Sequence, residues 1–231
     1  MKTIGMLGGM SWESSAVYYQ IINREMRKRL GGIHSAKALM YSFDFDEIQS
    51  LQAAGRWDEA TTMLTRVGET LARGGADFLM ICCNTMHLMA DAVERAAGIP
   101  LLHIADATGA AIRAKGLKRV GLVGSHHTTE KGGIVIDRLR EKFGLDVLVP
   151  DKEDRDEIHR IIVEEMCQGK FLESSRETHR RVFAKLVARD AEGVILGCTE
   201  IPILVKAEDA GIPLFDTTTL HAMAAVDLAL A

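Results

Sequence analysis

The sequence predicts an α/β fold built from two pseudo-symmetric domains, each with a parallel sheet covered by helices on both faces. Two observations lead to this prediction. Short runs rich in Ile, Val and Leu alternate with longer amphipathic stretches, and segments of the first half of the chain recur in the second half. Strands that are apolar throughout and separated by helices are typical of parallel sheets buried on both faces.

Eight segments have the pattern expected of buried strands. Each is short, almost continuously apolar, and bounded by Gly, Pro, Asn or Asp, which favour turns. In chain order the predicted strands are residues 3–7, 36–42, 78–82, 101–104, 120–123, 145–149, 194–196 and 214–215. Eight amphipathic segments lie after these strands and have helical spacing of their apolar residues. The predicted helices are residues 14–30, 58–73, 86–97, 108–115, 128–143, 154–167, 173–188 and 218–231.

The composition is that of a globular protein without a strongly charged surface. The chain has 231 residues, of which 47% are hydrophobic and 26% charged, and its net charge is −4. A chain of this length buries roughly 70% of the surface that it exposes when unfolded, so it needs no disulfides. The charge favours neither nucleic acid nor anionic lipid, and no apolar run approaches the roughly 18 residues of a membrane span. Because the opening segment is too short and strand-like for a signal peptide, we expect a cytoplasmic protein.

Three segments recur in the same order at a nearly constant offset. The matched pairs are residues 2–8 with 118–124, 78–85 with 193–200, and 98–101 with 211–214. Such recurrence predicts two related α/β halves. We expect the first half to cover 1–104 and to recover the last helix, 216–231, while the second half covers 105–215.

The repeat also selects two of the four cysteines. It pairs Cys83 with Cys198 and sets Cys82 against Gly197, whereas Cys167 has no matched partner. Since side chains alternate along a strand, Cys82 is expected to point into the core on the face opposite to Cys83. Ligands of open parallel sheets bind beyond the carboxyl ends of the strands, where the two paired cysteines lie.

Two matched thiols on related halves suit one kind of chemistry. Inverting a stereocentre by proton transfer needs a base on one face of the carbon and an acid on the other, and the two roles exchange in the reverse direction. A thiol has an ordinary pKa near 8.5, which a helix N-terminus or a cation lowers towards neutrality. If the two halves face each other, Cys83 and Cys198 lie on opposite walls of one cleft. The sequence therefore predicts racemisation.

Several motifs together resemble the aspartate/glutamate racemase family. They are CNT at 83–85, GCTE at 197–200, LGGMSWESS at 7–15, HSAKALMYS at 34–42 and HIADAT at 103–108. The resemblance covers nearly the whole chain. It implies a two-domain fold with the active site in the cleft between the domains, a homodimer, and free amino acids as substrates. It also implies catalysis by Cys83 and Cys198 without pyridoxal phosphate or any other cofactor.

Substrate contacts are expected from polar residues at the strand ends. The candidates are Met10, Ser11, Gln52, Asn84, Thr85, Ser125, Thr128, Thr129 and Thr199. Each Ser, Thr or Asn in this set also suits a helix cap without any contact to substrate.

Two segments depart from what the family resemblance implies. Residues 41–54 contain no Lys or Arg to bind the side-chain carboxylate of an acidic substrate, and residues 131–134 carry a Gly pair where a bulky aromatic residue is expected. Both departures leave room for neutral or more varied amino acids.

Other functions remain open at this point. Related folds with paired cysteines also support hydantoin racemisation, cis–trans isomerisation of diacids and decarboxylation, and a non-catalytic protein that binds small molecules is a further alternative. Cys83 and His87 are too few ligands for a dedicated metal site. The glycines at 5, 8 and 9 do not form the G-x-G-x-x-G pattern of dinucleotide-binding proteins.

Overall fold

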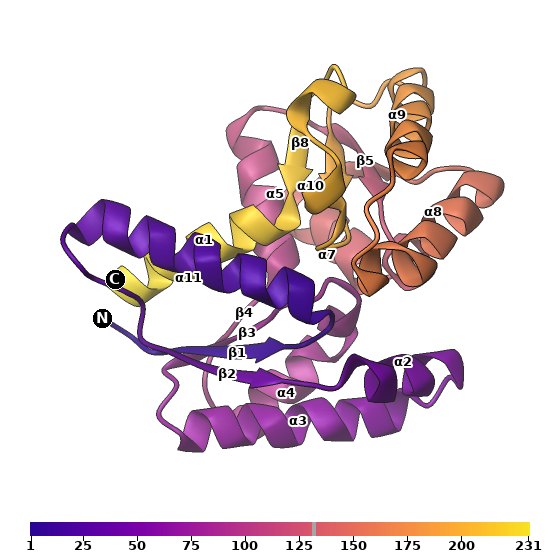
Figure 1. Cartoon of the computed structure of the whole chain (residues 1–231). Coiled ribbons are helices and arrows are strands. Elements are labelled where there is room, and N and C mark those ends of the chain that lie inside the picture. The colour runs from indigo at the N-terminus through magenta and orange to yellow at the C-terminus, as the bar shows by residue number, and fades with distance from the viewer. Residues whose placement is uncertain (131–132) are drawn as a thin grey trace. The chain divides into compact units, whose positions relative to one another are not determined.

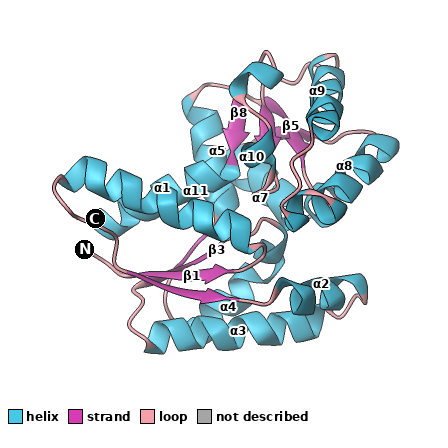
Figure 2. Cartoon of the chain, viewed as in Figure 1, coloured by secondary structure: helices cyan, strands magenta, loops and turns pink. Residues whose placement is uncertain are grey.

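The computed structural model describes residues 1–130 and 133–231, which form two compact units. Unit 1 comprises Met1–Ile104 together with His221–Ala231, and unit 2 comprises Ala105–Leu220. Unit 1 is therefore discontinuous in sequence. Its second segment begins at His221, whereas the sequence predicted that this segment begins at residue 216. Figures 1 and 2 show the elements of both units.

Unit 1 contains a four-stranded parallel sheet of order β2-β1-β3-β4. Its strands are β1 (Ile4–Gly8), β2 (Ala38–Ser42), β3 (Phe78–Ile81) and β4 (Leu101–Leu102). Its helices are α1 (Trp12–Leu30), α2 (Phe45–Ala53), α3 (Trp57–Arg73), the 3₁₀ helix η1 (Thr85–Met89), α4 (Ala90–Ala97) and most of α11 (Thr217–Leu230).

Helices bury both faces of this sheet. Tyr18 of α1 and Val226 of α11 pack with Met6 and Phe78 on one face. On the opposite face, α2, α3 and α4 pack over a second cluster that includes Leu79. Figure 1 shows α1 and α11 on one side of the sheet and α3 on the other. The continuous apolar pattern of the strands follows from burial on both faces.

Unit 2 contains a second four-stranded parallel sheet, of order β6-β5-β7-β8. Its strands are β5 (Arg119–Val123), β6 (Asp146–Leu148), β7 (Val194–Leu196) and β8 (Leu214–Asp216). Its helices are α5 (Ile104–Ala114), α6 (His126–Thr129), α7 (Ile134–Phe143), α8 (Lys152–Glu164), η2 (Met166–Gln168), α9 (Glu173–Val187), α10 (Ile201–Leu204) and η3 (Ala207–Asp209).

The second sheet is also buried on both faces. Ile158 of α8 and Phe183 of α9 pack against Leu196 on one face. Ile112 of α5 and Leu139 of α7 contribute to the cluster on the other face. Strand orders in the two sheets correspond element by element, with β1, β2, β3 and β4 matched to β5, β6, β7 and β8. The predicted fold class, two pseudo-symmetric α/β halves with parallel sheets, is confirmed.

Several details of the predicted elements are wrong. The helices expected at 86–97 and 154–167 are each divided, into η1 and α4 and into α8 and η2. The single helix expected at 128–143 is two helices, α6 and α7, because Glu130 and Gly133 both have an extended backbone (ψ 142° and 139°). The predictions omitted α2 and α10. The strand predicted at 101–104 pairs only through Leu101 and Leu102, and α5 begins at Ile104.

Lys131 and Gly132, which belong to the second departure from the family pattern, lie outside the described residues. Within the described part of the chain, no helix combines the length and apolar character needed to cross a membrane.

Candidate active site

The first candidate thiol lies directly beyond β3 in unit 1. The N–H of Cys82 donates to the carbonyl of Leu7 at 2.9 Å, which fixes the end of β3 against β1. Cys82 is fully buried in the cluster beneath α1 and α11. Cys83 is partly exposed and packs against the opposite cluster, which includes Met10. The alternation along the strand therefore sends the two neighbouring thiols to opposite faces of the sheet.

The turn after β1 brings Met10 and Ser11 to the same edge of the sheet. Gly9 has φ +86°, and a Cβ at this position would lie 2.4 Å from both the N and the O of Phe43, so only glycine fits. Ser15 Oγ accepts from the N–H of Gly9 at 2.8 Å and donates to the carbonyl of Ser11 at 2.8 Å. This pair of bonds explains why the LGGMSWESS segment has a serine at position 15.

Three further candidates of unit 1 lie at the Cys83 turn. Asn84 is buried at the start of η1, and Thr85, the first residue of η1, is partly exposed. Gln52 reaches this turn from α2, since its Nε2 lies 2.9 Å from Sδ of Met86. The structure thus gathers the unit 1 candidates around the carboxyl ends of β1 and β3.

His87 ties the Cys83 turn to the point where the chain leaves unit 1. The N–H of Ile104 donates to Nε2 of His87 at 3.1 Å, so Nε2 carries no proton. Nδ1 of the neutral ring then holds the proton and donates to the carbonyl of Cys83 at 2.8 Å. His87 is therefore a structural bridge held in one tautomer.

A second buried histidine acts where the chain returns to unit 1. Nε2–H of His221 donates to the carbonyl of Leu102 at 2.9 Å, which leaves Nδ1 to accept from the hydroxyl of Tyr18 at 3.1 Å. The side chain is fully buried, and this burial lowers the pKa of His221 to about 4. In unit 1, neutral imidazole rings thus make hydrogen bonds both where the first segment ends, at Ile104, and where the second segment begins, at His221.

The second candidate thiol, Cys198, lies directly beyond β7 in unit 2 and is partly exposed. The N–H of Gly197 donates to the carbonyl of Val123 at 2.7 Å. A Cβ on Gly124 would lie 2.8 Å from the carbonyl oxygen of Gly197, so the ends of β5 and β7 approach each other through glycine.

The remaining unit 2 candidates lie around this turn. Thr199 follows Cys198 and is buried, and a Cβ on Gly197 would lie 3.2 Å from Cγ2 of Thr128. The hydroxyls of Ser125 and Thr128 are 3.1 Å apart. Thr129 is buried and donates to the carbonyl of Ser125 at 2.9 Å, so its hydroxyl stabilises the first turn of α6.

One residue absent from the sequence candidates contacts the thiol directly. Sγ of Cys198 donates to Oε2 of Glu200 at 2.9 Å, and Oγ1 of Thr199 donates to the same oxygen at 3.0 Å. Burial raises the pKa of the Cys198 thiol well above its ordinary value, and the Glu200 carboxylate raises this pKa further. The sequence could have indicated Glu200 as a candidate, since it is the last residue of the GCTE motif.

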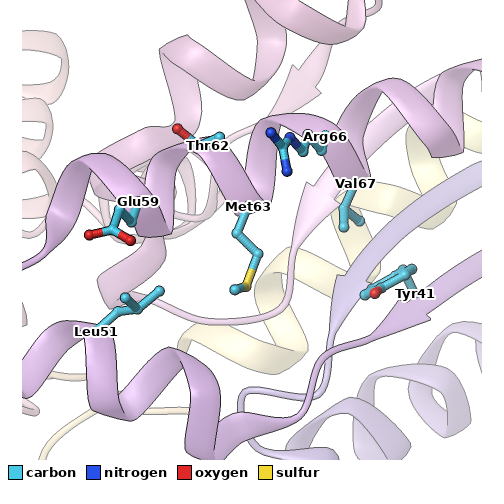
Figure 3. A pocket seen from close by; sticks show the side chains of 7 residues that line it. All are labelled: Tyr41, Leu51, Glu59, Thr62, Met63, Arg66 and Val67. Atoms are coloured by element: carbon cyan, nitrogen blue, oxygen red, sulfur yellow. The ribbon is translucent and has the colours of Figure 1, made fainter.

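Unit 1 also has a surface pocket of about 480 Å³ between β2, α2 and α3 (Figure 3). It is lined by Tyr41, Leu51, Glu59, Thr62, Met63, Arg66 and Val67. These lining residues include none of the candidates from the sequence. Within residues 1–130 and 133–231, no group of three or more His, Cys, Asp or Glu side chains is arranged to hold a metal ion.

Comparison with known proteins assigns the chain to a family. Residues 7–225 match the family model described as Asp/Glu/Hydantoin racemase. A solved structure of a candidate Asp/Glu racemase from Yersinia pestis is 49% identical, with a TM-score of 0.92 and coverage of 100% of both chains. The structure of an aspartate racemase homologue from Pyrococcus horikoshii is 32% identical, with a TM-score of 0.84 and coverage of 100% of both chains. The broad specificity amino-acid racemase RacX of Bacillus subtilis is 21% identical over 161 residues, which cover 70% of this chain and 68% of RacX. The chain belongs to the Asp/Glu/Hydantoin racemase family.

Proposed function

We propose that this protein is a cofactor-independent amino-acid racemase that interconverts L and D enantiomers by proton transfer between Cys83 and Cys198. The observation that carries the proposal is the matched position of the two thiols. Cys83 follows β3 and Cys198 follows β7, and these strands occupy equivalent places in two sheets of the same order. The family membership and the names of the relatives support the same reaction class.

The proposed reaction is balanced in protons. One cysteine, as the thiolate, removes the α-proton, and the electron pair of the broken C–H bond delocalises into the carboxylate. The other cysteine, as the thiol, then delivers its proton to the opposite face of the same carbon. The enzyme finishes with the protonation states of the two thiols exchanged. General acid–base steps of this kind contribute about 10²–10⁴-fold each to the rate.

The proposed substrate contacts are the polar residues of the two turns. Asn84 and Thr85 follow the first thiol, and Thr199 follows the second. We also propose that the substrates extend beyond aspartate and glutamate. Residues 41–54 carry no cation for a second carboxylate, and RacX, one of the relatives, is named for broad specificity.

Exchange of the α-proton in D₂O, followed by NMR over a panel of L- and D-amino acids, tests the proposal. The enzyme is dialysed and used without added cofactor. We expect deuterium uptake with inversion, and a loss of at least about 100-fold in Cys83→Ala and in Cys198→Ala. Cys167→Ala is the matched control, because Cys167 packs in the same cluster as Cys198 but follows no strand; it is expected to retain exchange.

Absence of exchange with every amino acid would refute the proposal. Exchange that survives removal of one thiol would refute the two-base mechanism while leaving a racemase. Turnover of hydantoins alone would move the protein to a different substrate class within the same family.

A further inference from the structure

The two thiol turns differ in charge, although they follow strands at equivalent places in the two sheets. Sγ of Cys198 donates to Oε2 of Glu200 at 2.9 Å, and Thr199 Oγ1 adds a second hydrogen bond to the same oxygen at 3.0 Å. Glu200 is only 2% exposed, so water screens its carboxylate poorly.

The repeat places an uncharged residue at the equivalent position of unit 1. Aligning residues 78–85 with 193–200 matches Asn84 with Thr199 and Thr85 with Glu200. A carboxylate therefore follows the second thiol by two residues, whereas a hydroxyl follows the first at the same spacing. The two thiols, which exchange the roles of acid and base in the proposed reaction, therefore have different electrostatic surroundings.

This asymmetry has a direct chemical consequence. A carboxylate in contact with a thiol stabilises S–H, which it binds as an acceptor, and repels the thiolate, which carries the same charge. We propose that Glu200 is a positioning residue that keeps Cys198 protonated in the resting enzyme, so that Cys198 donates the proton and Cys83 acts as the base in the first turnover. The assignment of donor and base rests on the two-base function proposed above.

The proton inventory of that turnover is as follows. The Cys83 thiolate takes the α-proton and becomes a thiol, and Cys198 gives its S–H proton to the opposite face of the carbon and becomes a thiolate. Glu200 then faces a thiolate in place of a hydrogen-bond donor. The state after turnover is therefore the less stable of the two enzyme forms, and it returns to the resting form when Cys83 releases a proton to water and Cys198 takes one up.

Alkylation of individual cysteines measures the protonation of each thiol without any substrate. The intact protein is treated with iodoacetamide across a series of pH values, and peptide mass spectrometry gives a separate rate for Cys83 and Cys198. Only the thiolate reacts, so the midpoint of each rate profile reports the pKa of that thiol. We expect the midpoint of Cys198 to lie at higher pH than that of Cys83.

Glu200→Gln removes the charge and keeps a hydrogen-bond acceptor of the same size. We expect it to lower the Cys198 midpoint by at least about one pH unit, which is about a tenfold faster reaction below the midpoint, and to leave Cys83 unchanged. Glu200→Asp, which restores the charge, is expected to restore the high midpoint. Glu208→Gln is the matched control, because Glu208 is an exposed carboxylate of the same unit, and it should shift neither cysteine.

Equal midpoints for the two cysteines in the unaltered protein would overturn the inference, even if the Glu200 variants fail to fold. An unchanged Cys198 midpoint in folded Glu200→Gln would also overturn it. These outcomes are separable from failure of the proposed function. Loss of the racemase assignment would appear as absent deuterium exchange, whereas loss of the Glu200 role would appear as unshifted alkylation in an enzyme that still exchanges.

Discussion

Lowering the pH should reduce the free energy of unfolding of unit 1, because His221 becomes protonated. This ring is fully buried and neutral, with Nε2–H bonded to the carbonyl of Leu102 and Nδ1 accepting from Tyr18. Protonation would place a charge in the core and remove the acceptor of the Tyr18 hydroxyl. The pKa of His221 is about 4 in the folded protein, against an ordinary value of 6.5.

The sign and size of the effect follow from linkage. The unfolded chain binds the proton more readily, so the stabilisation is complete above pH 6.5 and is lost as the pH falls from 6.5 towards 4. A difference of about 2.5 pKa units corresponds to about 3 kcal/mol in full. Between pH values of about 7.5 and 5, the expected loss in the free energy of unfolding is about 2 kcal/mol.

The two tryptophans make the assay specific for unit 1. Trp12 and Trp57 are the only tryptophans of the chain, and both lie in this unit. Urea unfolding followed by tryptophan fluorescence at the two pH values gives the pH dependence for the unaltered protein and for His221→Gln. The unaltered protein and His221→Gln share all the other histidines, so the contribution of these histidines to the pH dependence cancels when the two proteins are compared. A pH dependence in His221→Gln as steep as in the unaltered protein would refute the reasoning.

Two further predictions concern the same unit and use the same fluorescence. Gly9→Ala should lower the free energy of unfolding by about 2–4 kcal/mol more than Gly75→Ala, because both positions have positive φ but only the Cβ at Gly9 meets backbone, at 2.4 Å. Equal losses in the two variants would contradict the steric account. His87→Ala should cost about 1–3 kcal/mol, since it removes the bridge between Cys83 and Ile104, while His34→Ala at an exposed position should cost nearly nothing. A His87 variant as stable as the His34 variant would show that the bridge contributes no stability.

The strand pattern and the internal repeat predicted most of the fold, because parallel strands buried on both faces leave a continuous apolar signal. The helix α2 was missed for a physical reason. It buries only Ile48 fully, so its apolar periodicity is weak, although Asp44 accepts from the N–H of Asp46 at its N-terminus as a cap. The early start of α5 depends on the contact of Ile104 with His87, which is distant in sequence and leaves no local pattern.

The candidate site was predicted less completely than the fold. The matched segments 78–85 and 193–200 identified both strand ends that carry the thiols. The bond between Cys198 and Glu200 was not predicted, because sequence spacing does not say whether a side chain two residues away turns back towards a thiol or outward to solvent. The separate roles of Thr128 and Thr129 could not be told apart either, since only the geometry of α6 commits the Thr129 hydroxyl to the backbone.

The discontinuity of unit 1 affects the order in which the two units can fold during synthesis. Ala222 and Val226, from the very end of the chain, cover the face of the first sheet, and the N–H of Lys2 donates to the carbonyl of Ala229 at 2.8 Å. The first sheet must therefore wait with one face covered only in part, by α1, while the whole of unit 2 is synthesised, which takes on the order of 10 s. Unit 2 is complete in sequence at Leu220, whereas unit 1 cannot close its core until the segment His221–Ala231 has been synthesised. Because the two termini lie side by side, joining them and opening the chain immediately before α11 would give a circular permutant in which unit 1 is synthesised without interruption.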